Sequence, residues 1–192
     1  MNRTNGSLAY QDPLQEELIG GKLVMMAPPL TNHNFISGNI YMMLREFLKG
    51  KRCKPFGDGT LVCLTEEDHF IPDAMVVCDP DKIKYNGVYG APDLVVEILS
   101  HSTAKYDLGY KKDIYERCGV REYWIVNPGS KSVSQYVLTD GKFELREVCT
   151  LLPDYMLADM SEEERAEVKS SFPSVVLDGL AVQLALVFED VI

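Results

Sequence analysis

Three side chains near the middle of the chain have the types and positions that metal-dependent phosphate chemistry requires. Glu97 lies inside the apolar run 94–99, where an unpaired carboxylate costs several kcal/mol unless a cation neutralises it. Asp73 opens a second apolar run at residues 74–77, and Lys111 follows in a segment that we expect to be helical. Two carboxylates suit a hard divalent cation, and a lysine can stabilise negative charge that develops on a phosphate. These residues are therefore candidates for one catalytic site.

A strand, a helix and a second strand are expected to position these side chains within residues 90–127. The β-branched, leucine-rich run at 94–99 and the run Tyr-Trp-Ile-Val at 123–126 predict the two strands. Between them, Ser102-Thr103 and Gly119 are typical start and stop signals for a helix of about 15 residues.

One face of this predicted helix is apolar, and a lysine interrupts it. The apolar positions at about 100° per residue are Ala104, Leu108, Ile114, Tyr115 and Cys118. Lys111 falls near the middle of that face, whereas Lys112 falls at its edge. A lysine in such a place must extend to solvent or meet a negative partner, so Lys111 is expected to meet Glu97, with Lys112 in a supporting position.

Strand geometry decides which carboxylate can share a metal ion with Glu97. Side chains alternate along a strand, so Asp93 and Glu97 share one face but lie about 13 Å apart. The ligands of Mg²⁺ lie about 2.1 Å from the ion, so Asp93 is too distant and can only support the site. Asp73 is the better candidate, because its strand precedes that of Glu97 and can pair beside it. In the alternative interpretation Asp73 caps a turn, Asp93 ends a loop and Glu97 pairs with a local base.

His33 lies in the first turn of another predicted helix, which Thr31 or Asn32 caps and which ends near Lys49. The apolar face of that helix is made by Ile36, Ile40, Met43, Leu44 and Phe47. Two interpretations of His33 remain open: a hydrogen-bonded core or capping histidine, or a residue at the rim of the active site.

Elsewhere the pattern predicts mainly strands. We expect a hairpin at 16–26 around Gly20-Gly21, strand-like segments at 53–64 and 70–78, and a loop at 79–89. A hairpin at 132–148 turns at Asp140-Gly141. A short helix at 161–170 begins with the capping-box pattern Ser161–Glu164, and a closing helix lies around 180–188.

Several of these segments resemble one protein family. The segments IPDAMVV, PDLVVEILS, YERCGV and EYWIVNP are similar to the Uma-two family of restriction-endonuclease-like proteins, within the PD-(D/E)xK nuclease superfamily. ELIGGKLV followed by His33 also matches the opening of that family, and the resemblance runs from about Glu17 to Phe188. It implies an α/β, restriction-endonuclease-like fold with a mixed central sheet flanked by helices. It also implies Asp73 and Glu97 as ligands of Mg²⁺ or Mn²⁺.

The chain departs from the superfamily pattern at the catalytic lysine. That lysine usually lies two residues after the acid on the same strand, and here this position is Leu99. The family takes the lysine from the following helix, where Lys111, four residues before Tyr115, occupies the matching position. Asn127-Pro128 stands where the family usually has Asp-Pro, and the acidic stretch 154–167 looks like an insertion.

Length and composition favour one globular domain. The chain has 192 residues, of which 46% are hydrophobic and 25% charged. We expect a polar lead-in at residues 1–13 and a single domain at 14–192, with an acidic insertion near 154–170. No apolar run approaches the roughly 20 residues of a membrane helix, and no signal peptide is visible, so we expect no membrane partner and a cytoplasmic location.

The cysteines indicate the same compartment. The five, Cys53, Cys63, Cys78, Cys118 and Cys149, show no metal-binding spacing, and we expect them to be buried reduced thiols.

The charge distribution bears on the partner. The net charge is −10, and residues 151–192 hold nine acidic against two basic residues, so the rest is nearly neutral. With no basic arm or arginine-rich cluster, we expect weak, metal-dependent DNA binding. A homodimer is plausible, because cutting both strands takes two sites.

These features favour a metal-dependent endonuclease that hydrolyses DNA phosphodiester bonds. The alternatives are a catalytically inactive nuclease fold that binds nucleic acid or a protein partner, and a metal hydrolase with another phosphate ester as substrate.

Overall fold

A mixed sheet of six strands forms the centre of the protein, seen here in a computed structural model that describes residues 15–192. The predicted lead-in at residues 1–13 lies outside the described residues. The strand order is β12-β11-β10-β9-β6-β3. The strands are β3 (Lys54–Gly57), β6 (Ala74–Val77), β9 (Leu94–Ile98), β10 (Glu122–Asn127), β11 (Ser132–Thr139) and β12 (Lys142–Thr150). Within this sheet only β9 and β10 pair in parallel, as expected for two strands joined by a helix.

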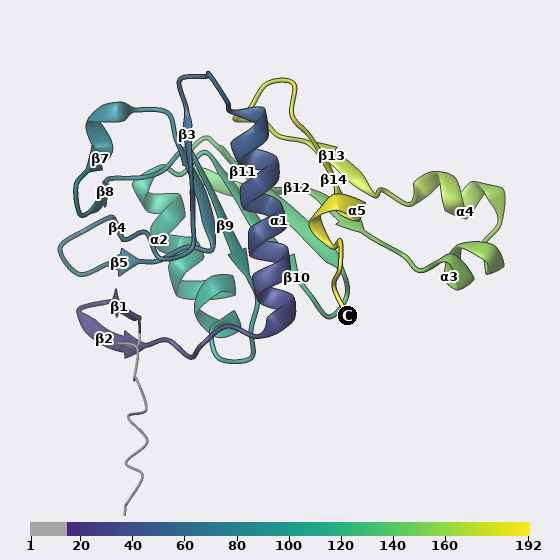
Figure 1. Ribbon diagram of the computed structural model, residues 1–192, viewed down its shortest axis with the longest axis horizontal. Helices are drawn as coiled ribbons and strands as arrows, with labels where there is room; N and C mark the ends of the chain where they lie inside the picture. Colours follow the sequence, from purple (N-terminus) through teal and green to yellow (C-terminus); the bar gives the residue numbers. More distant parts are fainter. Residues whose placement is uncertain (1–14) are drawn as a thin grey trace, which may run out of the picture.

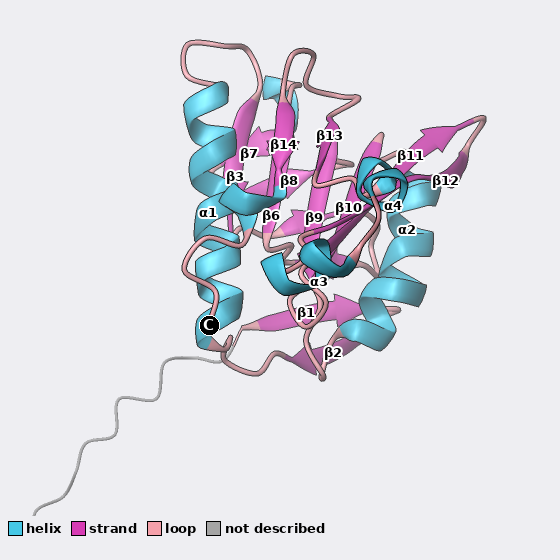
Figure 2. Ribbon diagram, turned by 90° about the vertical axis from the view of Figure 1, so that its right-hand side faces the viewer, coloured by secondary structure: helices cyan, strands magenta, loops and turns pink. Residues whose placement is uncertain are grey.

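Helices cover both faces of this sheet. α1 (Thr31–Phe47) lies on one face, and α2 (Lys111–Cys118) on the other (Figures 1 and 2). Residues of β9 alternate between these layers: Leu94, Val96 and Ile98 pack with α1, while Val95 packs with α2. The expected α/β fold with a mixed sheet flanked by helices is confirmed.

α1 begins close to the expected residue but without the expected cap. Its N-cap is Leu30, and no side chain caps it, so the prediction that Thr31 or Asn32 is the cap was wrong. The predicted apolar face was right in its centre, because Ile36, Ile40 and Leu44 are fully buried.

A second sheet has the order β2-β1-β5-β4-β8-β7. Its strands are β1 (Glu16–Ile19), β2 (Lys22–Met25), β4 (Val62–Cys63), β5 (His69–Phe70), β7 (Ile83–Lys84) and β8 (Gly87–Tyr89). The loop predicted at 79–89 therefore contains a 3₁₀ turn, η1 (Pro80–Lys82), and a small hairpin. Gly87 permits this, because a β-carbon there would lie 2.6 Å from the carbonyl oxygen of Leu61.

The C-terminal part adds an arm and a small sheet. The arm carries α3 (Asp154–Asp159) and α4 (Glu162–Glu167), which project from the body (Figure 1). The predicted capping box at Ser161 and Glu164 is present. β13 (Ser171–Pro173) pairs with β14 (Ala181–Gln183), and α5 (Leu184–Val187) follows. The predicted helix at 180–188 was therefore partly wrong, because its first residues pair with β13.

The prediction that all cysteines are reduced was wrong. Cys53 and Cys78 form a disulfide, while Cys63, Cys118 and Cys149 are free thiols. The register that pairs Lys54 with Val77 puts the two cysteines opposite each other at the ends of β3 and β6, with their Cα atoms 3.9 Å apart. This proximity depends on strand pairing, which sequence spacing does not reveal.

Within residues 15–192, no helix combines the length and apolar character needed to cross a membrane.

Candidate active site

Asp73 and Glu97 lie opposite each other on neighbouring strands. β6 pairs with β9 in antiparallel register, with Ala74 opposite Val96. One step further along this register brings Asp73, the residue before β6, opposite Glu97. Opposite residues of an antiparallel pair point to the same face, so both carboxyl groups face the side of the sheet that α2 covers.

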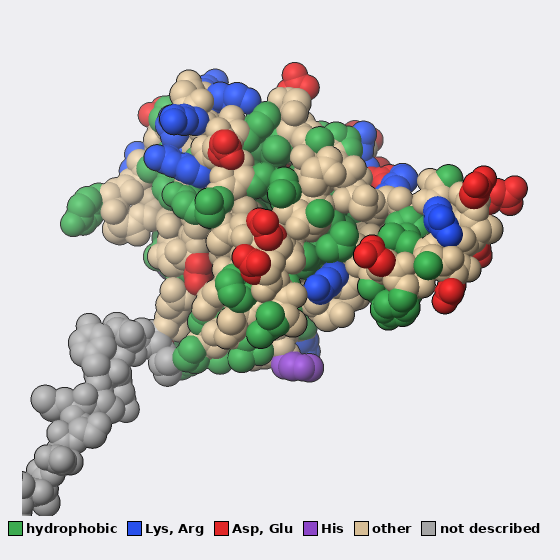
Figure 3. Space-filling model, turned by 45° about the vertical axis from the view of Figure 1, so that its right-hand side comes forward, with side chains coloured by type: hydrophobic (Ala, Val, Ile, Leu, Met, Phe, Trp, Pro, Cys, Tyr) green, Lys and Arg blue, Asp and Glu red, His purple; other side chains and the backbone are tan. Residues whose placement is uncertain are grey.

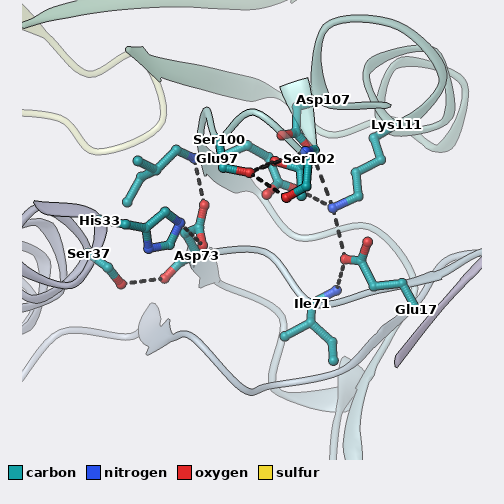
Figure 4. A network of polar contacts seen from close by, with 12 residues as sticks. Glu17, His33, Ser37, Ile71, Asp73, Glu97, Ser100, Ser102, Asp107 and Lys111 are labelled. Carbon is teal, nitrogen blue, oxygen red and sulfur yellow. Dashed lines mark hydrogen bonds and ion pairs between the residues drawn. The ribbon is translucent and has the colours of Figure 1, made fainter. Parts of the chain in front are cut away.

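Lys111 lies at the centre of a buried cluster of carboxylates (Figure 4). Its Nζ atom is 2.8 Å from Glu17 Oε1, 3.3 Å from Glu97 Oε1 and 3.4 Å from Asp107 Oδ1. The lysine is 1% exposed. The structure therefore brings Lys111 and Glu97 together, with two further acids that sequence reasoning missed.

A π-helical segment explains why Asp107 was missed. The segment η2 (Tyr106–Tyr110) precedes α2, and the amide of Lys111 donates to the carbonyl of Tyr106, five residues back. This wider turn changes the helical phase, so Leu108 is 52% exposed and Asp107 is buried in its place. The apolar face predicted through Leu108 was therefore wrong. Insertions of this kind are frequent at functional sites. The i,i+4 spacing of Asp107 and Lys111 was the available signal.

Glu17 enters the cluster from the second sheet. β1 has a buried side at Glu17 and Ile19, and Glu17 Oε1 accepts a hydrogen bond from the amide of Ile71 at 2.7 Å. The apolar alternation of β1 marks Glu17 only weakly, because Glu16 precedes it and either residue can face outward. In the structure β1 pairs with β5, and the Glu17 side chain is fully buried.

His33 contacts Asp73 from the other layer. Its Nε2 atom lies 3.0 Å from Asp73 Oδ1, and Asp73 Oδ2 accepts a 2.6 Å hydrogen bond from the amide of Ile98. Burial alone would lower the pKa of His33, but the hydrogen bond and charge of Asp73 outweigh it and raise the pKa. The His33 and Asp73 side chains are 15% and 12% exposed, so they form the more open side of the cluster.

Two predicted supporting residues lie outside the cluster. Asp93 accepts a hydrogen bond from the amide of Cys78 at 2.7 Å and pairs with Arg121 at 3.3 Å. Lys112 extends over the ring of Tyr136, with Nζ 3.8 Å from the ring centre. The supporting roles expected for Asp93 and Lys112 are therefore not matched by contacts with Glu97 or Lys111.

Acidic side chains outnumber basic ones inside the cluster, and burial acts on the pKa of each. Burial raises the pKa of Glu97 well above its usual range; Lys111 opposes this, while Asp107, Asp73 and Glu17 add to it. Burial also raises the pKa of Asp107. Lys111 shows the complementary effect: burial would lower its pKa, but Glu97, Glu17 and Asp107 raise it above the ordinary value. The hydroxyl of Tyr115, whose pKa burial raises, donates to Glu97 Oε1 at 2.8 Å.

This donor set fits a hard divalent cation that keeps water ligands. The oxygen Oε2 of Glu17 is buried without a hydrogen-bond partner, and the acids outnumber the cations around it. No three or more His, Cys, Asp or Glu side chains between residues 15 and 192 are already arranged around a metal position. Mg²⁺ commonly binds through one or two carboxylates, with water and substrate phosphate as its other ligands. Asp73 and Glu97 are two carboxylates of the kind that such a site uses.

The fold and this cluster define a restriction-endonuclease-like protein. A putative nuclease belonging to DUF820 from Anabaena variabilis superposes with a TM-score of 0.68, over 90% of this chain and 89% of that chain, at 18% identity. Residues 8–177 match the model of the Uma2 family, described as putative restriction endonuclease. The chain belongs to the Uma2 family.

Two relatives from Synechocystis are also similar to this chain. The uncharacterized protein slr1290 is 27% identical over 173 residues, which cover 89% of this chain and 85% of that protein. The uncharacterized protein sll1609 is 27% identical over 126 residues, which cover 64% of this chain and 71% of that protein.

Proposed function

We propose that this protein is a metal-dependent endonuclease that hydrolyses DNA phosphodiester bonds. The observation that carries the proposal is the meeting of Asp73, Glu97 and Lys111 at one place in a restriction-endonuclease-like fold. The family description and the similar putative nuclease support the same class of reaction.

Asp73 and Glu97 hold Mg²⁺ or Mn²⁺ in this proposal. When bound, the cation lowers the pKa of a coordinated water and offsets charge on the phosphate. The chain contributes the position of both carboxylates. The amide of Ile98 and the imidazole of His33 orient Asp73, and the hydroxyl of Tyr115 and the ammonium of Lys111 orient Glu97.

Lys111 supplies the positive charge for the transition state. In hydrolysis a water oxygen forms a bond to phosphorus while the bond to the leaving oxygen breaks, and negative charge gathers on the other phosphate oxygens. An ammonium group beside the scissile phosphate stabilises that charge. Glu17 and Asp107 hold the ammonium of Lys111 on the side of α2 that faces Glu97.

The direct test is cleavage of plasmid and linear DNA by purified protein with Mg²⁺ or Mn²⁺. We expect nicks or cuts that EDTA stops. Glu97→Gln keeps the side-chain shape but removes the charge that holds the metal, so cleavage should fall to background while the thermal unfolding midpoint stays near that of wild type.

The principal alternative is a nuclease fold that binds nucleic acid or a protein partner without cutting. Wild-type protein that cuts neither DNA nor RNA with any of these metals would replace the endonuclease proposal by this one.

A further inference from the structure

Positive charge gathers at the end of α1 in an otherwise acidic protein. Five basic residues lie within ten positions, all exposed: Arg45, Lys49, Lys51, Arg52 and Lys54. Figure 3 shows this group of side chains at the upper left, over the end of α1. We call these five residues the α1–β3 basic surface. These five residues include two arginines and three lysines, and the end of α1 and the start of β3 leave all five exposed.

A groove adjoins the basic surface. It is a shallow, open depression of about 500 Å³ along α1 and the residues just after it, lined by Tyr41, Met42, Arg45, Glu46 and Lys49. Tyr41 packs beside β3, where a β-carbon on Gly57 would lie 3.4 Å from its ring. Met42 is 70% exposed. An aromatic ring next to cationic side chains is the combination that binds single nucleic-acid strands, because bases stack on the ring and phosphates meet the cations.

The basic surface and the candidate active site lie at opposite ends of the same elements. His33 and Arg45 are twelve residues apart on α1, which is about 18 Å along a helix. That distance equals about five nucleotides of one DNA strand at roughly 3.4 Å each. β3 also leads from Lys54 to Gly57 and then to Asp58, a residue whose pKa is raised by burial and by the nearby charge of Asp73.

β3 lies beside the basic surface, at the edge of the central sheet. β3 is the last strand of the central sheet, and α1 lies against it. Glu46 is the acidic residue in the groove, and its charge limits the affinity.

We propose that the α1–β3 basic surface and the Tyr41 groove bind one strand of DNA, a few nucleotides from the phosphodiester at the Asp73–Glu97 site. Lys49, Lys51 and Arg52 contact phosphates, and Tyr41 stacks on a base. This inference rests on the proposed function for the identity of the nucleic acid.

The test measures binding rather than cleavage. A fluorescent DNA single strand and the matching duplex are titrated in EDTA across a salt series. The slope of log affinity against log salt is negative. In Lys49→Gln/Arg52→Gln its magnitude should be smaller than in wild type by about 1.4 for the single strand. The matched control Arg146→Gln/Arg165→Gln removes two exposed charges on β12 and α4, and its slope should equal that of wild type. Thermal unfolding midpoints verify that both double variants fold.

Tyr41→Leu separates stacking from charge. It should weaken single-strand binding by about tenfold or more while leaving the salt slope unchanged. The proposal would be overturned if wild-type protein bound no DNA at low salt. It would also be overturned if Lys49→Gln/Arg52→Gln bound DNA as tightly, and with the same salt slope, as Arg146→Gln/Arg165→Gln.

These outcomes are independent of cleavage. If wild type cuts no DNA but binds it, and Lys49→Gln/Arg52→Gln weakens that binding, the surface assignment stands and the endonuclease proposal fails. If wild type cuts DNA while both double variants bind alike, the endonuclease proposal stands and the surface assignment fails.

Discussion

Glu17 and Lys111 form a 2.8 Å ion pair although 94 residues separate them, and both side chains are buried. The pair joins β1 of the second sheet to α2 of the central layer. Glu17 also accepts a hydrogen bond from the amide of Ile71, so the β1 strand orients the lysine that faces Glu97. This contact makes the second sheet part of the candidate active site.

Glu17→Gln should impair the site without unfolding the protein. The amide oxygen of glutamine can still accept the hydrogen bond from Ile71, but the charge that holds Lys111 is lost. We expect DNA cleavage to fall by about tenfold to a hundredfold, which corresponds to the loss of one charge-assisted hydrogen bond of about 1.5–3 kcal/mol. Glu16→Gln, an exposed neighbour on β1, is the control and should cut like wild type. Equal activity of the two variants would remove Glu17 from the site.

Lys111→Met and Lys112→Met should differ sharply in DNA cleavage and in the free energy of unfolding. Lys111→Met leaves Glu17, Glu97 and Asp107 without their shared cation, so it should abolish cleavage and lower the free energy of unfolding by about 3–5 kcal/mol. The unpaired carboxyls then have folded-state pKa values above their unfolded values. Their stability penalty is therefore largest at neutral pH and shrinks as the pH falls and they bind protons.

Lys112 contacts the ring of half-buried Tyr136, a contact of about 1 kcal/mol away from the carboxylate cluster, so Lys112→Met should retain cleavage. Urea unfolding at two pH values and a cleavage assay measure both variants. Loss of activity in Lys112→Met with retention in Lys111→Met would contradict the assigned lysine.

Glu122 should be essential for stability but not part of the chemistry. It is fully buried on β10, on the face away from the carboxylate cluster, and joins the C-terminal segment to the sheet. Its carboxylate accepts hydrogen bonds from Trp124 Nε1, Gln135 Nε2, Ser174 Oγ and the amides of Val175 and Val176. Glu122→Ala leaves these donors without their shared acceptor and should lower the free energy of unfolding by about 3–5 kcal/mol.

Fluorescence of the single tryptophan, Trp124, reports unfolding directly beside this contact. Glu144→Ala, at an exposed position on β12, serves as the control and should cost less than about 0.5 kcal/mol. If Glu122→Ala lowered the free energy of unfolding by less than about 1 kcal/mol, the hydrogen bonds to the Glu122 carboxylate would contribute little to stability.

The disulfide between Cys53 and Cys78 should stabilise the sheet edge. It closes a loop with a sequence separation of 25 residues, for which loop-closure entropy predicts about 3.5 kcal/mol. The urea midpoint of unfolding should therefore be lower in Cys53→Ser/Cys78→Ser than in wild type. Reductant should lower the urea midpoint of wild type by a similar amount. Cys118→Ser, which changes a free thiol, is the control. Alkylation of the unfolded, unreduced protein should label three cysteines. Labelling of all five would contradict the disulfide.

Local sequence patterns determined much of the fold and several candidate site residues. Runs of β-branched residues marked β9 and β10, and Asp140-Gly141 marked the β11–β12 hairpin, because each depends on neighbouring residues and short-range backbone preferences. Glu97 and Lys111 were conspicuous for a related reason. A charge in an apolar run is costly, so its presence alone indicates a partner.

Tertiary structure decided which partners these charges meet. Glu17 reaches Lys111 only through the pairing of β1 with β5, and Asp107 is buried only because η2 changes the helical phase. Cys53 meets Cys78 because β3 pairs with β6, and Asp93 turns away from the site to meet Arg121. Apart from the contact of Asp107 with Lys111, each of these contacts joins segments whose separation along the chain contains no information about their separation in space. The free energy of packing the whole sheet, and not any local preference, selects them.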